Sequence, residues 1–207
     1  MGKRLFDLIC ASVGVLLLAP LMLGIALWIK LDSAGPVFFR QQRVGRFGVP
    51  FAIHKFRTMR DDTPAHARAD ASAISSQLTV GADPRITRAG RFLRRTKLDE
   101  LPQLLDVLAG TMSLVGPRPE VPRYVAMYPA ALRVKVLSVR PGITDPASIA
   151  YRDEGELLAR AADPERLYVE QVMPAKLRRA AQYVDHHSLR GDLRLIGATL
   201  RALWLRR

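Results

Sequence analysis

The segment Leu8–Ile29, LICASVGVLLLAPLMLGIALWI, decides the fold, because it contains no charged side chain. A helix needs roughly 20 apolar residues to cross the hydrocarbon core of a bilayer. A helix of this length in the core of a soluble protein usually keeps a polar face. The apolar stretch of a cleaved signal peptide is shorter, at about 7–15 residues. The segment therefore predicts a helix that enters a membrane.

Basic residues flank this apolar segment on both sides. They are Lys3 and Arg4 before it and Lys30, Arg40, Arg43 and Arg46 after it. Basic residues next to a membrane helix favour the cytoplasmic side, so both ends of the segment are expected in the cytoplasm. A re-entrant hairpin satisfies this expectation. A single kinked helix that spans the bilayer, with the rest of the protein in the cytoplasm, is the alternative.

Pro20 lies near the middle of the apolar segment, directly after Ala19. A proline removes the hydrogen bond to the carbonyl of Leu16 and clashes with it, which bends the helix. Each arm then has about a dozen residues, or roughly 18 Å at 1.5 Å per residue. That length is too short for about 30 Å of hydrocarbon. We therefore expect a re-entrant membrane helix hairpin over residues 1–31 and a cytoplasmic domain over 32–207.

The composition limits the partners of the chain. Its 207 residues include 32 Lys and Arg against 19 Asp and Glu, a formal net charge of +13. This excess favours nucleic acid, phosphate-bearing ligands or an acidic membrane surface. The basic residues are not interleaved with aromatic ones, as a surface for single-stranded nucleic acid requires, so we expect no nucleic-acid partner. With one cysteine, Cys10, the chain can form neither an internal disulfide nor a thiolate metal cluster.

The rest of the sequence predicts an α+β fold that is mostly helical. Gly45 and Gly48 supply the turn of an extended hairpin at 36–58. Residues 61–82 are polar and predict a mobile loop or a loosely packed helix. Three prolines make 115–122 extended or turn-like. Helices are expected at 85–110, with a bend or restart at Pro102, and at 129–139, 153–158, 164–186 and 189–207.

The last of these helices has the pattern of an interfacial helix. Its apolar residues recur at helical spacing, with arginines in much of the remainder; they are Leu189, Leu193, Ile196, Leu200 and Trp204. A basic amphipathic helix with a terminal tryptophan suits the membrane interface. A surface helix packed on the protein core is the alternative, and the two roles can coexist.

The densest group of charges is Arg91–Gln103, RFLRRTKLDELPQ, in which Asp99 and Glu100 are adjacent acids among basic residues. Consecutive side chains of a helix point about 100° apart, so the two carboxylates take different partners. One can face a substrate while the other holds a metal. A solvated charged face is the alternative.

A second motif, GPRPE, follows at Gly116–Glu120. Its Arg118 lies between two prolines, which lowers the entropy cost of orienting its backbone. Guanidinium is the preferred group for bidentate phosphate binding. Lys55, Arg57 and Arg152 could add positive charge around a phosphate.

Four motifs together resemble the bacterial sugar transferase family, in the minimal form of the monotopic polyprenyl-phosphate phosphoglycosyl transferases. The first is KRLFDLI near the N-terminus, and the second is the hairpin PVFFRQQRVG…KFRTM. The third is TKLDELPQLLDVLAGTMSLVGPRPE, and the fourth is RPGIT. The similarity runs from about Lys3 to Leu200. It implies an enzyme that uses Mg²⁺ and a re-entrant membrane helix.

The resemblance also implies roles for individual residues. Asp99 matches the nucleophile, and Glu100 matches the neighbouring acid that binds Mg²⁺. Arg94 matches a basic residue of the same helix. The other matching positions are associated with substrate or phosphate binding; they are Lys55, Arg118, Arg152 and Asp192. One departure is Ala19, because the helix break of the family is usually Ser-Pro.

The reaction that the resemblance implies moves a sugar 1-phosphate from a UDP-sugar to polyprenyl (undecaprenyl) phosphate and releases UMP, through a phosphosugar intermediate on Asp99. It would take place at the cytoplasmic face of a bacterial inner membrane and begin the synthesis of exopolysaccharide, O-antigen, capsule or glycoprotein. The sequence leaves a homodimer open. A membrane-tethered basic module that binds anionic lipid or nucleic acid without catalysis is the alternative. A membrane-bound nucleotide-sugar hydrolase is a third interpretation.

Overall fold

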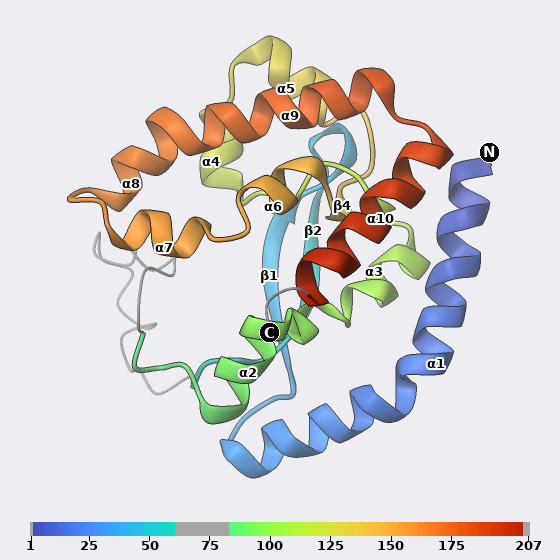
Figure 1. Ribbon diagram of the computed structural model, residues 1–207, viewed down its shortest axis with the longest axis vertical. Helices are drawn as coiled ribbons and strands as arrows, with labels where there is room; N and C mark the ends of the chain where they lie inside the picture. Colours follow the sequence, from blue (N-terminus) through green and yellow to red (C-terminus); the bar gives the residue numbers. More distant parts are fainter. Residues whose placement is uncertain (1, 61–82, 205–207) are drawn as a thin grey trace.

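A computed structural model describes residues 2–60 and 83–204 of the chain. The predicted loop or loose helix at 61–82 and the end of the predicted C-terminal helix, 205–207, lie outside these residues. Figure 1 shows helices arranged around two small sheets, with α9 across the top and α1 along the right and lower edges. The expected α+β, mostly helical fold is confirmed.

The N-terminal helix α1 runs without interruption over Gly2–Asp32, with Pro20 inside it. Figure 1 shows two arms that meet at a bend. Of the described helices, α1 is long and apolar enough to cross a membrane. Its outer surface is formed by exposed apolar side chains, including Leu16, Leu23 and Leu31, each more than 70% exposed. Re-entry as opposed to a single span stays a prediction.

Both arms of α1 also pack against the rest of the protein. On the first arm, the buried Asp7 accepts hydrogen bonds from Ser113 Oγ (2.8 Å) and the Leu114 amide (3.2 Å). On the second arm, Ile25 and Ile29 are buried in one apolar cluster with Phe56 and Leu93. The helix that we expect in the membrane is therefore part of the hydrophobic core.

The predicted hairpin is confirmed. Strands β1 (Phe38–Val44) and β2 (Pro50–Phe56) pair antiparallel. The short 3-10 helix η1 (Arg46–Gly48) joins them, with positive φ at Phe47 (59°) and Gly48 (79°). Glycine adopts that left-handed region freely, which is why Gly48 ends the turn. The hairpin brings Lys55 to the carboxylates of the next segment.

The prediction of one helix over 85–110 is wrong at Lys97. The helix α2 (Arg88–Thr96) ends there because Lys97 has a left-handed backbone, with φ 59°. A 3-10 turn, η4 (Leu98–Glu100), follows, and α3 (Gln103–Ala109) begins after Pro102. The expected restart at Pro102 is confirmed. Asp99 and Glu100 consequently lie on a tight turn, and Arg94 lies on a different helix from Asp99.

A parallel pair of three-residue strands follows, β3 (Ser113–Val115) with β4 (Gly142–Thr144). The sequence did not predict this pair. The backbone approaches itself closely at this pair, because a Cβ added to Gly142, the first residue of β4, would lie 2.0 Å from the amide nitrogen of Gly116, directly after β3. Only a residue without a side chain fits there. The close contact between the backbones at Gly116 and Gly142 therefore fixes the position of the first residue of the GPRPE motif.

The remaining helices cover the second half of the chain. They are α4 (Pro122–Ala126), α5 (Ala130–Val136), α6 (Pro146–Ala150), α7 (Glu154–Ala159), α8 (Pro164–Leu167), the π-helix η5 (Tyr168–Val172), α9 (Met173–His186) and α10 (Leu189–Trp204). The helices predicted at 129–139, 153–158 and 164–186 are confirmed with small shifts of their ends. Apolar residues of α4, α5, α7, η5 and α9 form one core cluster. Helix α10 lies beside the first arm of α1 in Figure 1, and Lys3 bonds Asp192 across them.

Candidate active site

The two adjacent acids are buried where three segments meet. Asp99 and Glu100 are 8% and 9% exposed, and they lie on η4, directly after the left-handed Lys97. Lys55 comes from β2, and Arg118 comes from the segment after β3. Because carboxylates are seldom buried without paired charges, this location sets Asp99 and Glu100 apart from an ordinary charged surface.

Glu100 is held by two cations. Its Oε1 accepts hydrogen bonds from Lys55 Nζ (2.9 Å) and Arg118 Nη2 (2.6 Å), and its Oε2 accepts a longer one from Arg118 Nη1 (3.3 Å). Arg118 thus binds both oxygens of the carboxylate, the fork geometry that guanidinium favours with carboxylate and phosphate. The structure brings together three of the predicted site residues, Lys55, Glu100 and Arg118.

Burial and mutual charge shift the pKa values of Glu100, Lys55 and Arg118. Burial opposes the ionisation of Glu100, but the charges of Arg118 and Lys55 outweigh it and hold the pKa of that carboxyl well below its usual range. The Glu100 charge raises the pKa of Arg118. Burial lowers the pKa of the Lys55 amine, while Glu100 opposes that effect. Glu100 is therefore an anion at neutral pH.

Asp99 has a different environment from its neighbour. Within the described part of the chain, its Oδ1 is buried and has no hydrogen-bond partner. Burial, and next the charge of Glu100, raise the pKa of the Asp99 carboxyl, while Lys55, Lys97 and Arg94 lower it. An unpaired buried oxygen costs free energy, so a group that binds there would relieve a cost that already exists. Asp99 has the properties of a reacting group, and Glu100 those of a fixed one.

The described part of the chain contains no group of three or more side chains that could hold a metal ion, so a metal at this position would rest on the pair Asp99 and Glu100. Mg²⁺ is commonly held by one or two carboxylates together with substrate phosphates and water. Glu100 Oε2 accepts only a long hydrogen bond, and Asp99 Oδ1 accepts none. Two adjacent carboxylates with free lone pairs fit such a site.

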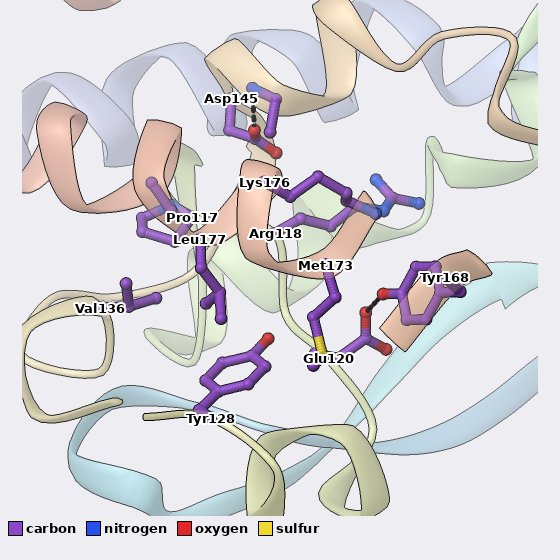
Figure 2. A pocket seen from close by; sticks show the side chains of 12 residues that line it. Pro117, Arg118, Glu120, Tyr128, Val136, Asp145, Tyr168, Met173, Lys176 and Leu177 are labelled. Atoms are coloured by element: carbon purple, nitrogen blue, oxygen red, sulfur yellow. Dashed lines mark hydrogen bonds between the residues drawn. The ribbon is translucent and has the colours of Figure 1, made fainter. Parts of the chain in front are cut away.

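A second ion pair, between Arg43 and Glu120, lies next to Arg118 in the GPRPE segment. Arg43 Nη1 donates to Glu120 Oε1 (3.1 Å), and the Tyr168 hydroxyl donates to Glu120 Oε2 (2.5 Å). Figure 2 shows Glu120 and Tyr168 at one side of a small pocket that Arg118 also lines. Sequence reasoning missed the roles of Arg43 and Tyr168. Both residues reach Glu120 from segments that are distant in the sequence, so no local sequence pattern indicates them.

The structure places the other predicted site residues at four separate positions. Arg94 lies on α2 and influences Asp99 through its charge. Arg57 is buried and donates to the carbonyl and hydroxyl of Ser33, after the end of α1. Arg152 is partly exposed and bonds Asp153 and the Ala202 carbonyl of α10.

Asp192, the last predicted site residue, is fully buried on α10. It accepts hydrogen bonds from Lys3 Nζ (2.6 Å) and the Tyr183 hydroxyl (2.8 Å). Its contacts therefore join α10 to α1 and α9. The predicted substrate-binding roles of Arg57, Arg152 and Asp192 stay predictions.

The candidate site thus combines two buried carboxylates, Asp99 with an oxygen that has no partner among the described residues and Glu100 held by a lysine and an arginine. The chain belongs to the bacterial sugar transferase family, because the family model of that description matches residues 1–206. The resemblance of the four motifs is thereby confirmed.

Individual relatives are known from several bacteria. The chain is 37% identical over 214 residues to a UDP-glucose:undecaprenyl-phosphate glucose-1-phosphate transferase of Caulobacter vibrioides, with 97% of this chain and 69% of the relative covered. It is 36% identical over 214 residues to the exopolysaccharide production protein ExoY of Rhizobium meliloti, with 100% and 87% covered.

Other relatives are much longer than this chain. It is 34% identical over 203 residues to a UDP-N-acetylgalactosamine-undecaprenyl-phosphate N-acetylgalactosaminephosphotransferase of Aeromonas hydrophila, and that match covers 97% of this chain and 43% of the relative. The match to a UDP-glucose:undecaprenyl-phosphate glucose-1-phosphate transferase of Escherichia coli is 42% identical and covers 33% of the relative.

Proposed function

We propose that this protein transfers a sugar 1-phosphate from a UDP-sugar to undecaprenyl phosphate and releases UMP, as the first membrane step of surface glycan synthesis. The observation that carries the proposal is the buried, unpaired oxygen of Asp99 beside Glu100, which is held by Lys55 and Arg118. The names of the relatives support the donor and the acceptor.

In the first step, an oxygen of the Asp99 carboxylate attacks the β-phosphorus of the UDP-sugar. A bond forms between Asp99 and the β-phosphorus, and the bond from that phosphorus to the bridging oxygen breaks. UMP leaves with the bridging oxygen and the electron pair. The sugar phosphate stays on Asp99 as an acyl phosphate. An ionised carboxylate needs no general base for this attack.

In the second step, an oxygen of undecaprenyl phosphate attacks the same phosphorus. The bond from phosphorus to Asp99 breaks, and the carboxylate is regenerated. The product is undecaprenyl diphosphate sugar. Two half-reactions allow one site to receive a water-soluble donor and a lipid acceptor in turn. The exposed leucines of α1 support the delivery of the acceptor from the bilayer.

The cations of the site have complementary roles in both steps. Arg118 and Lys55, already held at Glu100, can stabilise the negative charge that develops on the phosphate oxygens in the transition state. Mg²⁺, held by Glu100 and the diphosphate, would supply further charge neutralisation when bound. Arg94 and Lys97 favour the ionised form of Asp99.

The proposal includes the location of the protein. The basic flanks of α1 favour a cytoplasmic position for both ends, so α1 enters the inner membrane and returns. The first arm begins beside the start of α10, and the second arm ends where the chain leads into β1 (Figure 1). Both arms then hold the active site at the depth of the lipid phosphates.

The test is UMP release by the detergent-purified protein. A panel of UDP-sugars that includes UDP-glucose and UDP-N-acetylgalactosamine is supplied with Mg²⁺, with and without undecaprenyl phosphate. We expect sustained release that requires lipid and metal, and a phosphosugar adduct on wild-type protein in mass spectra when lipid is omitted. Asp99→Asn should abolish turnover and adduct, while Asp185→Asn, in a surface pair with Lys135, should retain both.

Three outcomes would overturn parts of the proposal. Substantial turnover by Asp99→Asn would exclude the covalent route. Sustained UMP release without lipid would identify a hydrolase. Silence with every donor, together with salt-dependent nucleic-acid or lipid binding, would favour the non-catalytic module.

A further inference from the structure

A second cavity lies at the start of the first arm of α1, and neither Asp99 nor Glu100 lines it. Its volume is about 210 Å³. The side chains that matter for its chemistry come from α1, η1, the segment before β4, and the end of α9; they are Lys3, Arg4, Arg46, Arg140, Tyr183 and His187. None of these residues belongs to the catalytic group described above.

The cavity has an excess of positive charge. Four Lys and Arg side chains line it, while Asp7 is the acid among its lining residues. Lys3 is balanced locally, because its Nζ lies 2.6 Å from Asp192 Oδ2 and 4.0 Å from Asp7 Oδ1. In the described part of the chain, the three arginines bond carbonyl oxygens and form no ion pair with a carboxylate.

The three arginines are oriented by backbone carbonyl groups. Arg4 donates to the carbonyls of Val107 (2.7 Å) and Leu108 (3.2 Å) at the end of α3. Arg140 Nε donates to the Gly110 carbonyl (2.8 Å), and Arg46 Nε donates to the Ser138 carbonyl (2.8 Å). Within the described residues, the hydrogen-bond partners of these three guanidinium groups are carbonyl oxygens and not carboxylates.

A guanidinium group has five N–H donors in a rigid fork. Where Nε is fixed on a carbonyl, as in Arg46 and Arg140, the terminal nitrogens remain for an anion. Guanidinium is a preferred protein ligand for phosphate oxygens. A cavity of this size accommodates a phosphate group with its first substituents, because on the same measure a single water needs only about 10–15 Å³.

The neighbouring helices indicate what the phosphate is attached to. Leu5 follows Arg4 on α1 and is 61% exposed, and Ile9 one turn later is 55% exposed. On α10, Leu189 and Leu193 are 45% and 52% exposed. Figure 1 shows the starts of α1 and α10 side by side at this end of the molecule. Exposed apolar side chains beside a cationic cavity match a ligand with a charged head and apolar chains.

We propose that this cavity binds the phosphodiester headgroup of an anionic phospholipid, with the acyl chains lying along the exposed leucines of α1 and α10. The headgroup balances the charges of Arg4, Arg46 and Arg140. A zwitterionic headgroup brings its own cation toward these arginines and binds less well. The site anchors the first arm of α1 independently of the reaction.

The test is direct lipid binding by the full chain in detergent, without UDP-sugar, so that its result does not depend on turnover. Native mass spectrometry compares dioleoyl phosphatidylglycerol with dioleoyl phosphatidylcholine and with the deacylated glycerophosphoglycerol. We expect the first to bind at least about tenfold more tightly than either of the others, or about 1.4 kcal/mol. Phosphatidylcholine brings its own cation toward the arginines, and the deacylated headgroup has no acyl chains to bury.

The variants are Arg46→Gln and Arg140→Gln, with Arg178→Gln as the control of equal charge change on an exposed position of α9. We expect each cavity variant to weaken phosphatidylglycerol binding about tenfold and the control to leave it unchanged. Loss of Arg140 also removes its hydrogen bond to the Gly110 carbonyl at the end of α3. Arg46 lies in the exposed hairpin turn, so Arg46→Gln tests the site without that disturbance. Circular dichroism checks the fold of each variant.

Two results would overturn this proposal. An equal loss in all three variants would show only a general effect of net charge. Equal binding of phosphatidylcholine or of the deacylated headgroup would show that neither the net charge of the lipid nor its chains are recognised at this cavity.

Discussion

The substitution Glu100→Gln tests whether the charge of Glu100 stabilises the site. Glutamine has nearly the same shape but no charge. Lys55 and Arg118 would then remain buried beside a neutral amide, and its NH2 group would face one of these donors. The protein should fold but lose stability.

The expected loss of free energy of unfolding follows from the exposure of Glu100, Lys55 and Arg118. Loss of one partner of a buried ion pair costs about 3–5 kcal/mol. The side chains of Glu100, Lys55 and Arg118 are 11%, 18% and 32% exposed. Partial hydration of Arg118 places the expected loss near the lower limit, at about 3 kcal/mol. For a domain of this size, that loss lowers Tm by about 6–12 °C.

The assay is thermal unfolding in detergent at pH 7, with Glu170→Gln as the control. Glu170 pairs with Arg166 on the surface, and the two side chains are 54% and 71% exposed. Exposed pairs of this spacing contribute about 0.3–0.5 kcal/mol, so the control should shift Tm by no more than about 2 °C. A shift for Glu100→Gln no larger than that of the control would refute the reasoning.

The same comparison has a pH dependence of known sign. The pKa of the Glu100 carboxyl is lower in the folded protein than in the unfolded chain, where it is about 4.3. The stabilisation is therefore complete above that pH and is lost as the pH falls toward the folded pKa. The Tm difference between wild type and Glu100→Gln should narrow below about pH 4.

Three further predictions follow from single features. Gly90→Ala should destabilise the protein by about 1–3 kcal/mol, because its Cβ would lie 2.0 Å from the Thr58 carbonyl oxygen; Gly197→Ala, with no atom within 4 Å, should raise Tm or leave it unchanged, and equal effects would contradict the close packing. UMP release should decline in acid at a pH above the usual aspartate pKa of about 3.9, because burial raises the pKa of Asp99; an acid limb at or below that value would argue against it. Pro20→Ala should straighten α1 and carry the N-terminus across the membrane. A thiol reagent that does not cross the membrane, applied from the side opposite the cytoplasm, should then label Gly2→Cys in a Cys10→Ser background only when Pro20 is replaced. Labelling with Pro20 present would indicate that α1 spans the membrane.

The sequence was sufficient for the elements that depend on local patterns. The apolar segment around Pro20 gave a bent helix, and Gly45 and Gly48 gave the hairpin turn. The break at Lys97 could not be predicted, because lysine has no intrinsic preference for a left-handed backbone and the flanking residues suit a helix. The strands β3 and β4 are each three residues long, too short for an alternating pattern to appear.

The candidate site was partly predictable for a related reason. Asp99, Glu100 and Arg118 were found because acids and prolines cluster in the sequence, and the structure joins Glu100 to Arg118 directly. The pairing of Arg43 and Tyr168 with Glu120 depends on contacts between distant segments. No local pattern in a single sequence indicates such contacts.

The attachment of α1 to the protein core limits how its sequence can change. Ala11, Ile25 and Ile29 are almost completely buried against the rest of the protein, while most other positions of the helix face outward, as we propose, to lipid. A substitution in α1 must therefore suit either the packed protein core or the lipid, depending on its position. An unrelated anchor of equal hydrophobicity would lack the side chains that pack in the core and would not replace α1. Deletion of residues 1–32 would expose Phe56 and Leu93, so a water-soluble form of this enzyme requires a redesigned surface and not a truncation.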